Sequence, residues 1–139
     1  MIHLDTNAAI ALLNERPPGV RVRYEATRGS GAAFALSVVV YHELMYRAAA
    51  SERRRANEEK IALFIGAGGF TLLALDDADA REAADVRAHL RRAGAPIGPY
   101  DVFIAAQARR RGATLDTANT REFERVPGLV VADWARPAG

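Results

Sequence analysis

Short apolar runs alternate with longer segments of mixed polarity along the chain. The runs are bounded by polar, glycine or proline residues and are short enough for buried strands. We expect strands at residues 2–4, 34–37, 70–75, 114–117 and 129–131. The longer segments repeat apolar residues at the three- and four-residue spacing of a helix, as Tyr41, Leu44, Met45 and Ala48 do. We expect helices at residues 8–14, 20–28, 40–50, 51–65, 77–93 and 100–111.

Alternation of strands and helices predicts a three-layer α/β/α fold with a central, mainly parallel sheet of about five strands. The length of 139 residues suits one domain over residues 1–139. Cysteine is absent, which excludes disulfides and thiolate metal ligands. No apolar stretch approaches the roughly 20 residues of a membrane span. We therefore expect a soluble, cytoplasmic protein without membrane contact.

Three acidic residues stand near the junctions between predicted elements. Asp5 closes the first strand, Glu43 lies one turn into the helix after the second, and Asp101 lies in the first turn of the last long helix. The carboxyl ends of parallel strands meet at one rim of a sheet, so these acids can face one another. Two carboxylates about 5 Å apart repel by roughly 3 kcal/mol at an effective dielectric of 20. Such a group indicates a hard cation, Mg²⁺ or Mn²⁺, and phosphodiester hydrolysis.

Each acid taken alone also has an ordinary structural explanation. Asp5 can cap the first helix, because aspartate is a favoured residue before a helix. Glu43 can pair with Arg47 at the i, i+4 spacing. The side chain of Arg47 could equally narrow a groove beside the acids. Asp101 can complement the dipole of its helix. The metal site is therefore inferred from the joint placement of the three acids.

The net charge of +2 permits nucleic-acid binding without arguing strongly for it. Two basic clusters are candidates for contact with an RNA backbone, namely Arg53 with Arg54 and Arg109 with Arg110. They can equally be solvated helix faces or compensation of helix dipoles. We expect the large aromatic residues Tyr100 and Trp134 to pack in the protein rather than stack on bases, and His3 and His89 to be structural.

Four motifs together resemble the PIN domain, because they occur in the same order and at the same spacing as in that family. They are Leu4-Asp5-Thr6-Asn7, Ser37 through Glu43-Leu44, Ile97-Gly98-Pro99-Tyr100-Asp101 with Ile104-Ala105-Ala106, and Thr117-Ala118-Asn119-Thr120-Arg121-Glu122-Phe123. The closing Arg125-Val126-Pro127-Gly128-Leu129 and Asp133-Trp134 resemble the VapC toxin branch of that family. The resemblance covers nearly the whole chain.

What the resemblance implies is an endoribonuclease that depends on Mg²⁺ or Mn²⁺ and cuts tRNA or ribosomal RNA, so that translation stops. It implies a VapB-type antitoxin that holds the toxin inactive, with a tail that lies across the groove and places a basic side chain near the acids. It also implies a homodimer, by analogy alone. The apolar stretches 8–13 and 44–50 are either contact faces for the antitoxin or plain core.

The resemblance also implies roles for individual residues. Asp5, Glu43 and Asp101 would be the acidic catalytic residues, and Asp5 and Asp101 would hold the metal. Either Glu43 or Asp101 would be the general base. Asn119 matches a fourth catalytic position that many relatives fill with aspartate. The other matches, which would orient ligands or water, are Thr6, Asn7, Ser37 and Thr117.

Asp116 departs from the family pattern, because relatives usually carry an apolar strand residue at this position. Its side chain either points into a packed layer or lies at the rim and supplies the acid that Asn119 lacks. Two other functions stay open at this point. One is a non-catalytic PIN-fold module that binds RNA or protein, and the other is a structure-specific DNA nuclease of related fold.

Overall fold

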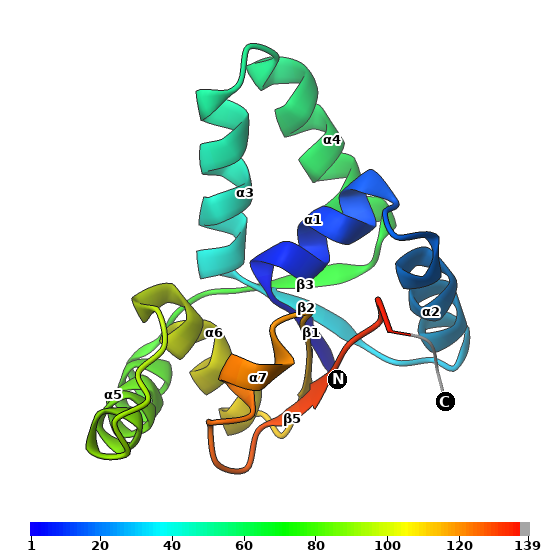
Figure 1. Ribbon diagram of the computed structural model, residues 1–139. Helices are drawn as coiled ribbons and strands as arrows, with labels where there is room; N and C mark the ends of the chain where they lie inside the picture. The colour runs from blue at the N-terminus through cyan, green and yellow to red at the C-terminus, as the bar shows by residue number, and fades with distance from the viewer. Residues whose placement is uncertain (137–139) are drawn as a thin grey trace.

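A parallel sheet of five strands forms the centre of the computed structural model, which describes residues 1–136 (Figure 1). The strands are β1 (Ile2–Leu4), β2 (Phe34–Ser37), β3 (Phe70–Leu73), β4 (Thr114–Asp116) and β5 (Val130–Ala132), in the order β3-β2-β1-β4-β5. Leu4 pairs with Asp116, and Asp116 pairs with Ala132. Because these strands are in parallel register, the residues that follow them lie along one rim of the sheet.

Seven helices pack around the sheet. They are α1 (Thr6–Asn14), α2 (Pro18–Gly29), α3 (Val38–Ala50), α4 (Arg54–Ala67), α5 (Asp77–Arg92), α6 (Pro99–Arg110) and α7 (Thr120–Phe123). In Figure 1, α1, α3 and α4 lie on one side of the sheet and α5 and α6 on the other. The α3–α4 hairpin extends away from the sheet. The three-layer fold expected from the sequence is confirmed.

The order of the strands creates a switch point at β1. From β1 the chain moves outward to β2 and β3, and it then returns across the sheet to add β4 and β5 on the other side. Doubly wound sheets bind ligands outside the carboxyl ends of the strands at such a point, because the connecting segments diverge there. Asp5, which follows β1, and Thr117, which follows β4, both lie at this position.

Aromatic residues fill the core beneath α2. Tyr24 on α2 lies with its ring centroid 5.1 Å from that of Phe34 and 6.1 Å from that of Trp134. Phe70 on β3 stacks on Tyr24 at 6.0 Å. Trp134 is only 4% exposed, so the expectation that it packs in the protein is confirmed. Through this cluster Trp134, which follows β5, packs against Tyr24 of α2 and Phe34 of β2.

The elements agree with the expected ones apart from their ends. The third strand stops at Leu73 instead of residue 75, and the last one is shifted to Val130–Ala132. The fourth helix begins at Arg54 and not at residue 51, because Ser51 ends α3 with a backbone N–H bond to Ala48. The short helix α7 was not expected. No helix among residues 1–136 is long and apolar enough to cross a bilayer.

Candidate functional site

Two hydrogen bonds fix the side chain of Asp5. Its Oδ1 accepts the backbone N–H of Ala8 at 2.8 Å, which caps α1, and its Oδ2 accepts the hydroxyl of Thr117 at 2.5 Å. The side chain is only 4% exposed. Burial raises the pKa of Asp5, the bonds from Thr117 and Ala8 oppose this, and the charge of Glu43 raises it further. The capping role is therefore confirmed, but it uses only one of the two oxygens.

Glu43 reaches the same rim from α3. The hydroxyl of Thr6, the first residue of α1, donates to Glu43 Oε1 at 2.8 Å. Within residues 1–136 Glu43 forms no ion pair with Arg47, so the structure does not bear out that alternative. Thr6 and Thr117 thus each hold one acid in place through a neutral hydroxyl, which leaves the carboxylate charge uncompensated.

Asp101 lies in the first turn of α6 and is partly buried. Its pKa is raised to about 6, by burial first and then by the negative charges of Asp5, Glu43 and Glu122. A Cβ atom added at Gly98 would lie 3.5 Å from Asp101 Oδ2, in ordinary van der Waals contact, so Gly98 adjoins this carboxylate. Mutual repulsion of this kind requires the acids to be neighbours. The three acids selected from the sequence are therefore near enough for the charges of Asp5 and Glu43 to raise the pKa of Asp101.

Glu122 is the acid that the sequence interpretation missed. It lies on the one-turn helix α7, which follows β4 after a bend at Ala118. Its charge contributes to the raised pKa of Asp101. The signal was present, because Glu122 belongs to the motif that begins at Thr117, but a one-turn helix is too short to show a periodic pattern.

The supporting residues have distinct places. Thr117 donates to Asp5 and accepts the backbone N–H of Asn119 at 2.9 Å, so it joins β4 to β1 and to α7. Asn119 is the residue before α7, and its side chain makes no capping bond. Ser37 is buried, and its hydroxyl accepts the N–H of Val39 to cap α3. Asn7 is exposed on α1 and lines a cavity beside Glu43.

Asp116 points away from this group. It is 2% exposed, and its Oδ1 accepts the backbone N–H of Trp134 at 2.9 Å. Burial raises the pKa of Asp116 to about 7, although the Trp134 bond lowers it. Of the two alternatives, the structure shows the packed one. The additional acid near Asp101 is Glu122 instead.

The donor set fits a hard divalent cation, because it consists of carboxylate and hydroxyl oxygens. A cation between Asp5 and Asp101 would relieve the repulsion that raises the pKa of Asp101. Within residues 1–136, no group of three or more histidine, aspartate or glutamate side chains lies close enough together to hold a metal ion. A Mg²⁺ ion held by Asp5 and Asp101 alone would keep several of its waters, because Mg²⁺ is usually bound through one or two carboxylates.

The basic clusters do not gather around the acids. Arg109 pairs with Glu82 at 2.6 Å, and Arg110 pairs with the buried Asp79 at 2.8 Å, both on α5. They occupy the last turn of α6, roughly 12 Å along the helix from Asp101 at 1.5 Å per residue. The other cluster lies where α4 begins, with Arg53 at its N-cap position and Arg54 paired with Glu58.

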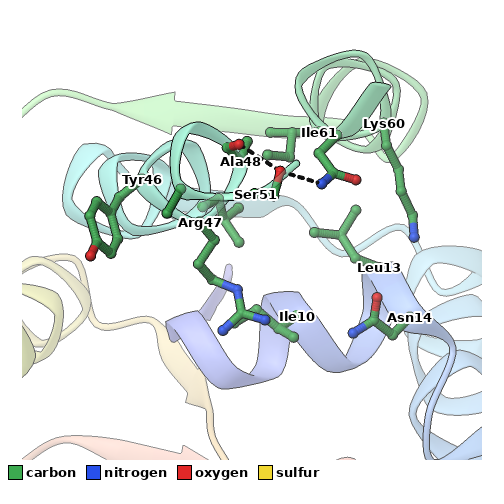
Figure 2. Close-up of a pocket in the computed structure, with 12 residues that line it drawn as sticks. Ile10, Leu13, Asn14, Tyr46, Arg47, Ala48, Ser51, Lys60 and Ile61 are labelled. Carbon is green, nitrogen blue, oxygen red and sulfur yellow. Dashed lines mark hydrogen bonds between the residues drawn. The ribbon is translucent and has the colours of Figure 1, made fainter. Parts of the chain in front are cut away.

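Two cavities open between the helices near the acids. One, of about 420 Å³, is lined by Thr6, Asn7, Ile10, His42, Glu43, Tyr46, Arg47 and Tyr100. The other, of about 400 Å³, lies between α1, α3 and α4 (Figure 2). Ile10, Tyr46 and Arg47 line both cavities. The two hollows therefore lie next to each other along the α1–α3 face.

Comparison with known proteins shows the family to which the chain is similar. Residues 2–129 match the PIN domain family. The chain is 39% identical over 132 residues to the tRNA(fMet)-specific endonuclease VapC of Shigella flexneri, an alignment that covers 95% of this chain and 96% of that protein. It is 30% identical over 134 residues to Ribonuclease VapC2 of Rickettsia felis, covering 94% and 96%.

Solved structures give the same result. DNA-bound VapBC from Salmonella typhimurium has a chain with a TM-score of 0.86 and 34% identity, covering 96% of this chain and 97% of that one. A chain of VapBC2 from Rickettsia felis, bound to a promoter DNA fragment, has a TM-score of 0.87 and 27% identity, covering 96% and 99%. The chain therefore belongs to the PIN domain family, within its branch of VapC ribonucleases.

Proposed function

We propose that the protein is a metal-dependent endoribonuclease and the toxin of a type II toxin–antitoxin pair. One observation carries the proposal. The carboxylates of Asp5, Glu43 and Asp101 lie at one rim of the sheet, and burial of Asp101 together with the charges of Asp5, Glu43 and Glu122 raises the pKa of Asp101 to about 6. Relatives at 30–39% identity over most of the chain are named as VapC ribonucleases, which supports the same activity.

Asp5 and Asp101 would hold Mg²⁺ or Mn²⁺. When bound, the cation supplies charge neutralisation for the phosphodiester and favours deprotonation of the attacking water. Thr117 orients Asp5 through Oδ2, and Thr6 holds Oε1 of Glu43, so that Oε2 of Glu43 can accept a proton. Asp101 is the other candidate for the general base, because a base is most effective when its pKa is near the working pH.

The substrate we propose is tRNA or ribosomal RNA, cut in the cytoplasm so that translation stops. The relative from Shigella flexneri is named as specific for tRNA(fMet), which favours tRNA. The whole chain would act as one nuclease domain, and two copies would form a homodimer by analogy with the family.

The partner we propose is a VapB-type antitoxin, as in the solved VapBC complexes. An apolar tail would enter the hollow between α1, α3 and α4, where Ile10, Leu13 and Leu44 line the wall (Figure 2). From there the tail would continue past Arg47 toward Glu43, since the two cavities adjoin. A basic side chain at its end would then neutralise the acids and occupy the place of the cation.

Incubation of the purified protein with total RNA and Mg²⁺ tests the nuclease, followed by sequencing of the new 5′ ends. We expect a small set of cleavage sites that disappear with EDTA and in Asp5→Asn and Asp101→Asn. The matched control is Asp85→Asn, an exposed acid on α5, which should cleave like the wild type. Cleavage by a folded Asp5→Asn protein would refute the site, and RNA binding without cleavage by the wild type would indicate a non-catalytic module.

A further inference from the structure

Exposed aromatic rings surround the cavity beside the acids. Tyr46 on α3 is 65% exposed and Tyr100 at the start of α6 is 49% exposed. The expectation that Tyr100 packs in the protein is therefore wrong. Its ring meets the exposed ring of His42 edge-on, at 5.8 Å between centroids and 81° between planes. Rings left in water contribute little to folding, so these residues call for another explanation.

One cation lines the same cavity. Arg47 lies one helical turn after Glu43 on α3, and it is exposed. Figure 2 shows its side chain reaching from α3 toward Ile10 on α1, while Tyr46 leaves α3 on the side away from Lys60. Arg47 forms no ion pair within the described part of the chain, unlike Arg109 and Arg110. Its guanidinium is thus available for a ligand.

We propose that Tyr46, Tyr100 and Arg47 form a subsite for an unpaired nucleotide next to the phosphodiester that is cut. A base would stack on the exposed face of one tyrosine, and Arg47 would bind the adjoining phosphate through its planar fork of donors. The cavity volume of about 420 Å³ lies within the range of small-ligand sites. This proposal rests on the proposed nuclease function, because the acids define where the scissile bond lies.

The chemistry selects single-stranded RNA over duplex. Bases within a duplex are covered on both faces by their neighbours, whereas unpaired bases can be splayed out onto aromatic side chains. Glu43 lines the same cavity as both tyrosines, so nucleotides beside the cut phosphate must pass along these rings. Substrate preference for an unpaired segment would therefore be set by α3 and the start of α6, and not by the paired arginines at the far end of α6.

Fluorescence anisotropy tests the subsite with two probes, fluorescein-labelled octauridylate and the same strand annealed to octaadenylate. EDTA is present throughout, so that binding is measured without cleavage. Tyr46→Ala and Tyr100→Ala should each weaken octauridylate binding about tenfold and leave the duplex unaffected, because stacking is lost. Tyr46→Phe and Tyr100→Phe should bind like the wild type. Arg47→Gln should weaken binding and reduce the dependence of log Kd on log salt by about one unit.

The matched control is Val22→Ala, which removes an exposed apolar side chain from α2 and should change nothing. Unchanged octauridylate affinity in the Tyr46→Ala/Tyr100→Ala protein would overturn the proposal and leave the rings to a protein partner. No detectable binding by the wild type, or an equal loss in the phenylalanine variants, would overturn it too. Ring-dependent binding without any RNA cleavage in Mg²⁺ would support the subsite while refuting the nuclease.

Discussion

Replacement of Thr117 by valine removes the hydroxyl that joins three elements while keeping the volume of the side chain. Thr117 is fully buried, donates to Asp5 Oδ2 at 2.5 Å and accepts the N–H of Asn119 at 2.9 Å. In Thr117→Val the Asp5 carboxylate keeps only its bond from Ala8. The side chain of Asp5 is then free to turn away from Asp101.

The expected cost follows from these two bonds. A hydrogen bond to a charged group contributes about 1.5–3 kcal/mol, and a buried N–H left without a partner costs about 1–3 kcal/mol. Partial relaxation of Asn119 toward water reduces the sum, so the free energy of unfolding should fall by roughly 3 kcal/mol. Thr117→Ser keeps both bonds and loses one methyl group, which costs about 0.8 kcal/mol.

Urea unfolding measures this difference through the fluorescence of Trp134, the only tryptophan of the chain, which is buried. RNA cleavage in Mg²⁺ is measured on the same proteins. We expect Thr117→Val to be the least stable and to lose most of its activity, and Thr117→Ser to stay near the wild type in both. Equal stability and equal cleavage in the two variants would refute the role given to the hydroxyl.

Three other predictions concern acidic residues that are buried or whose pKa is raised. Mn²⁺ affinity, measured by calorimetry, should fall as the pH drops through about 6, because the raised pKa of Asp101 makes a proton compete with the cation; constant affinity from pH 7 to 5 would contradict this. Asp116→Asn keeps an acceptor for Trp134 and should gain stability relative to the wild type as the pH rises from 5 to 8. The sign follows because the folded pKa of Asp116, about 7, exceeds its ordinary value of 3.8, so its contribution is favourable at low pH and is lost as the pH rises through 7; urea unfolding at both pH values decides. Asp79→Asn should cost about 1.5–3 kcal/mol in urea unfolding, because the fully buried Asp79 loses its charged hydrogen bonds from Arg110 and Arg111, and a loss below about 1 kcal/mol would contradict the importance of these bonds.

Much of the fold could be predicted from the sequence because burial leaves a periodic trace. The strand Phe34–Ser37 is buried at every position, so its apolar run had to be internal. Asp5 could be selected because it directly follows a buried strand, and the parallel order then places it at the rim with Asp101. The general placement of the three acids followed from topology alone.

Other features depend on contacts between segments that are far apart in sequence. Arg110 lies in a basic run that is typical of an RNA surface, but its partner Asp79 is 31 residues away on α5. The side chain of Asp116 could point either way until the position of Trp134 was known. Tyr100 is a large aromatic residue of the kind that usually packs in a core. Only the structure shows that it is 49% exposed.

Crystals grown with Mn²⁺ test the central claim most directly, through the anomalous difference density of the metal. We predict one strong peak within coordination distance of Asp5 and Asp101, with Glu43 facing it directly or through a water, and no such peak in Asp5→Asn crystals. A structure at saturating Mn²⁺ with no peak at this rim, or with Asp5, Glu43 and Asp101 directed to different places, would contradict the account.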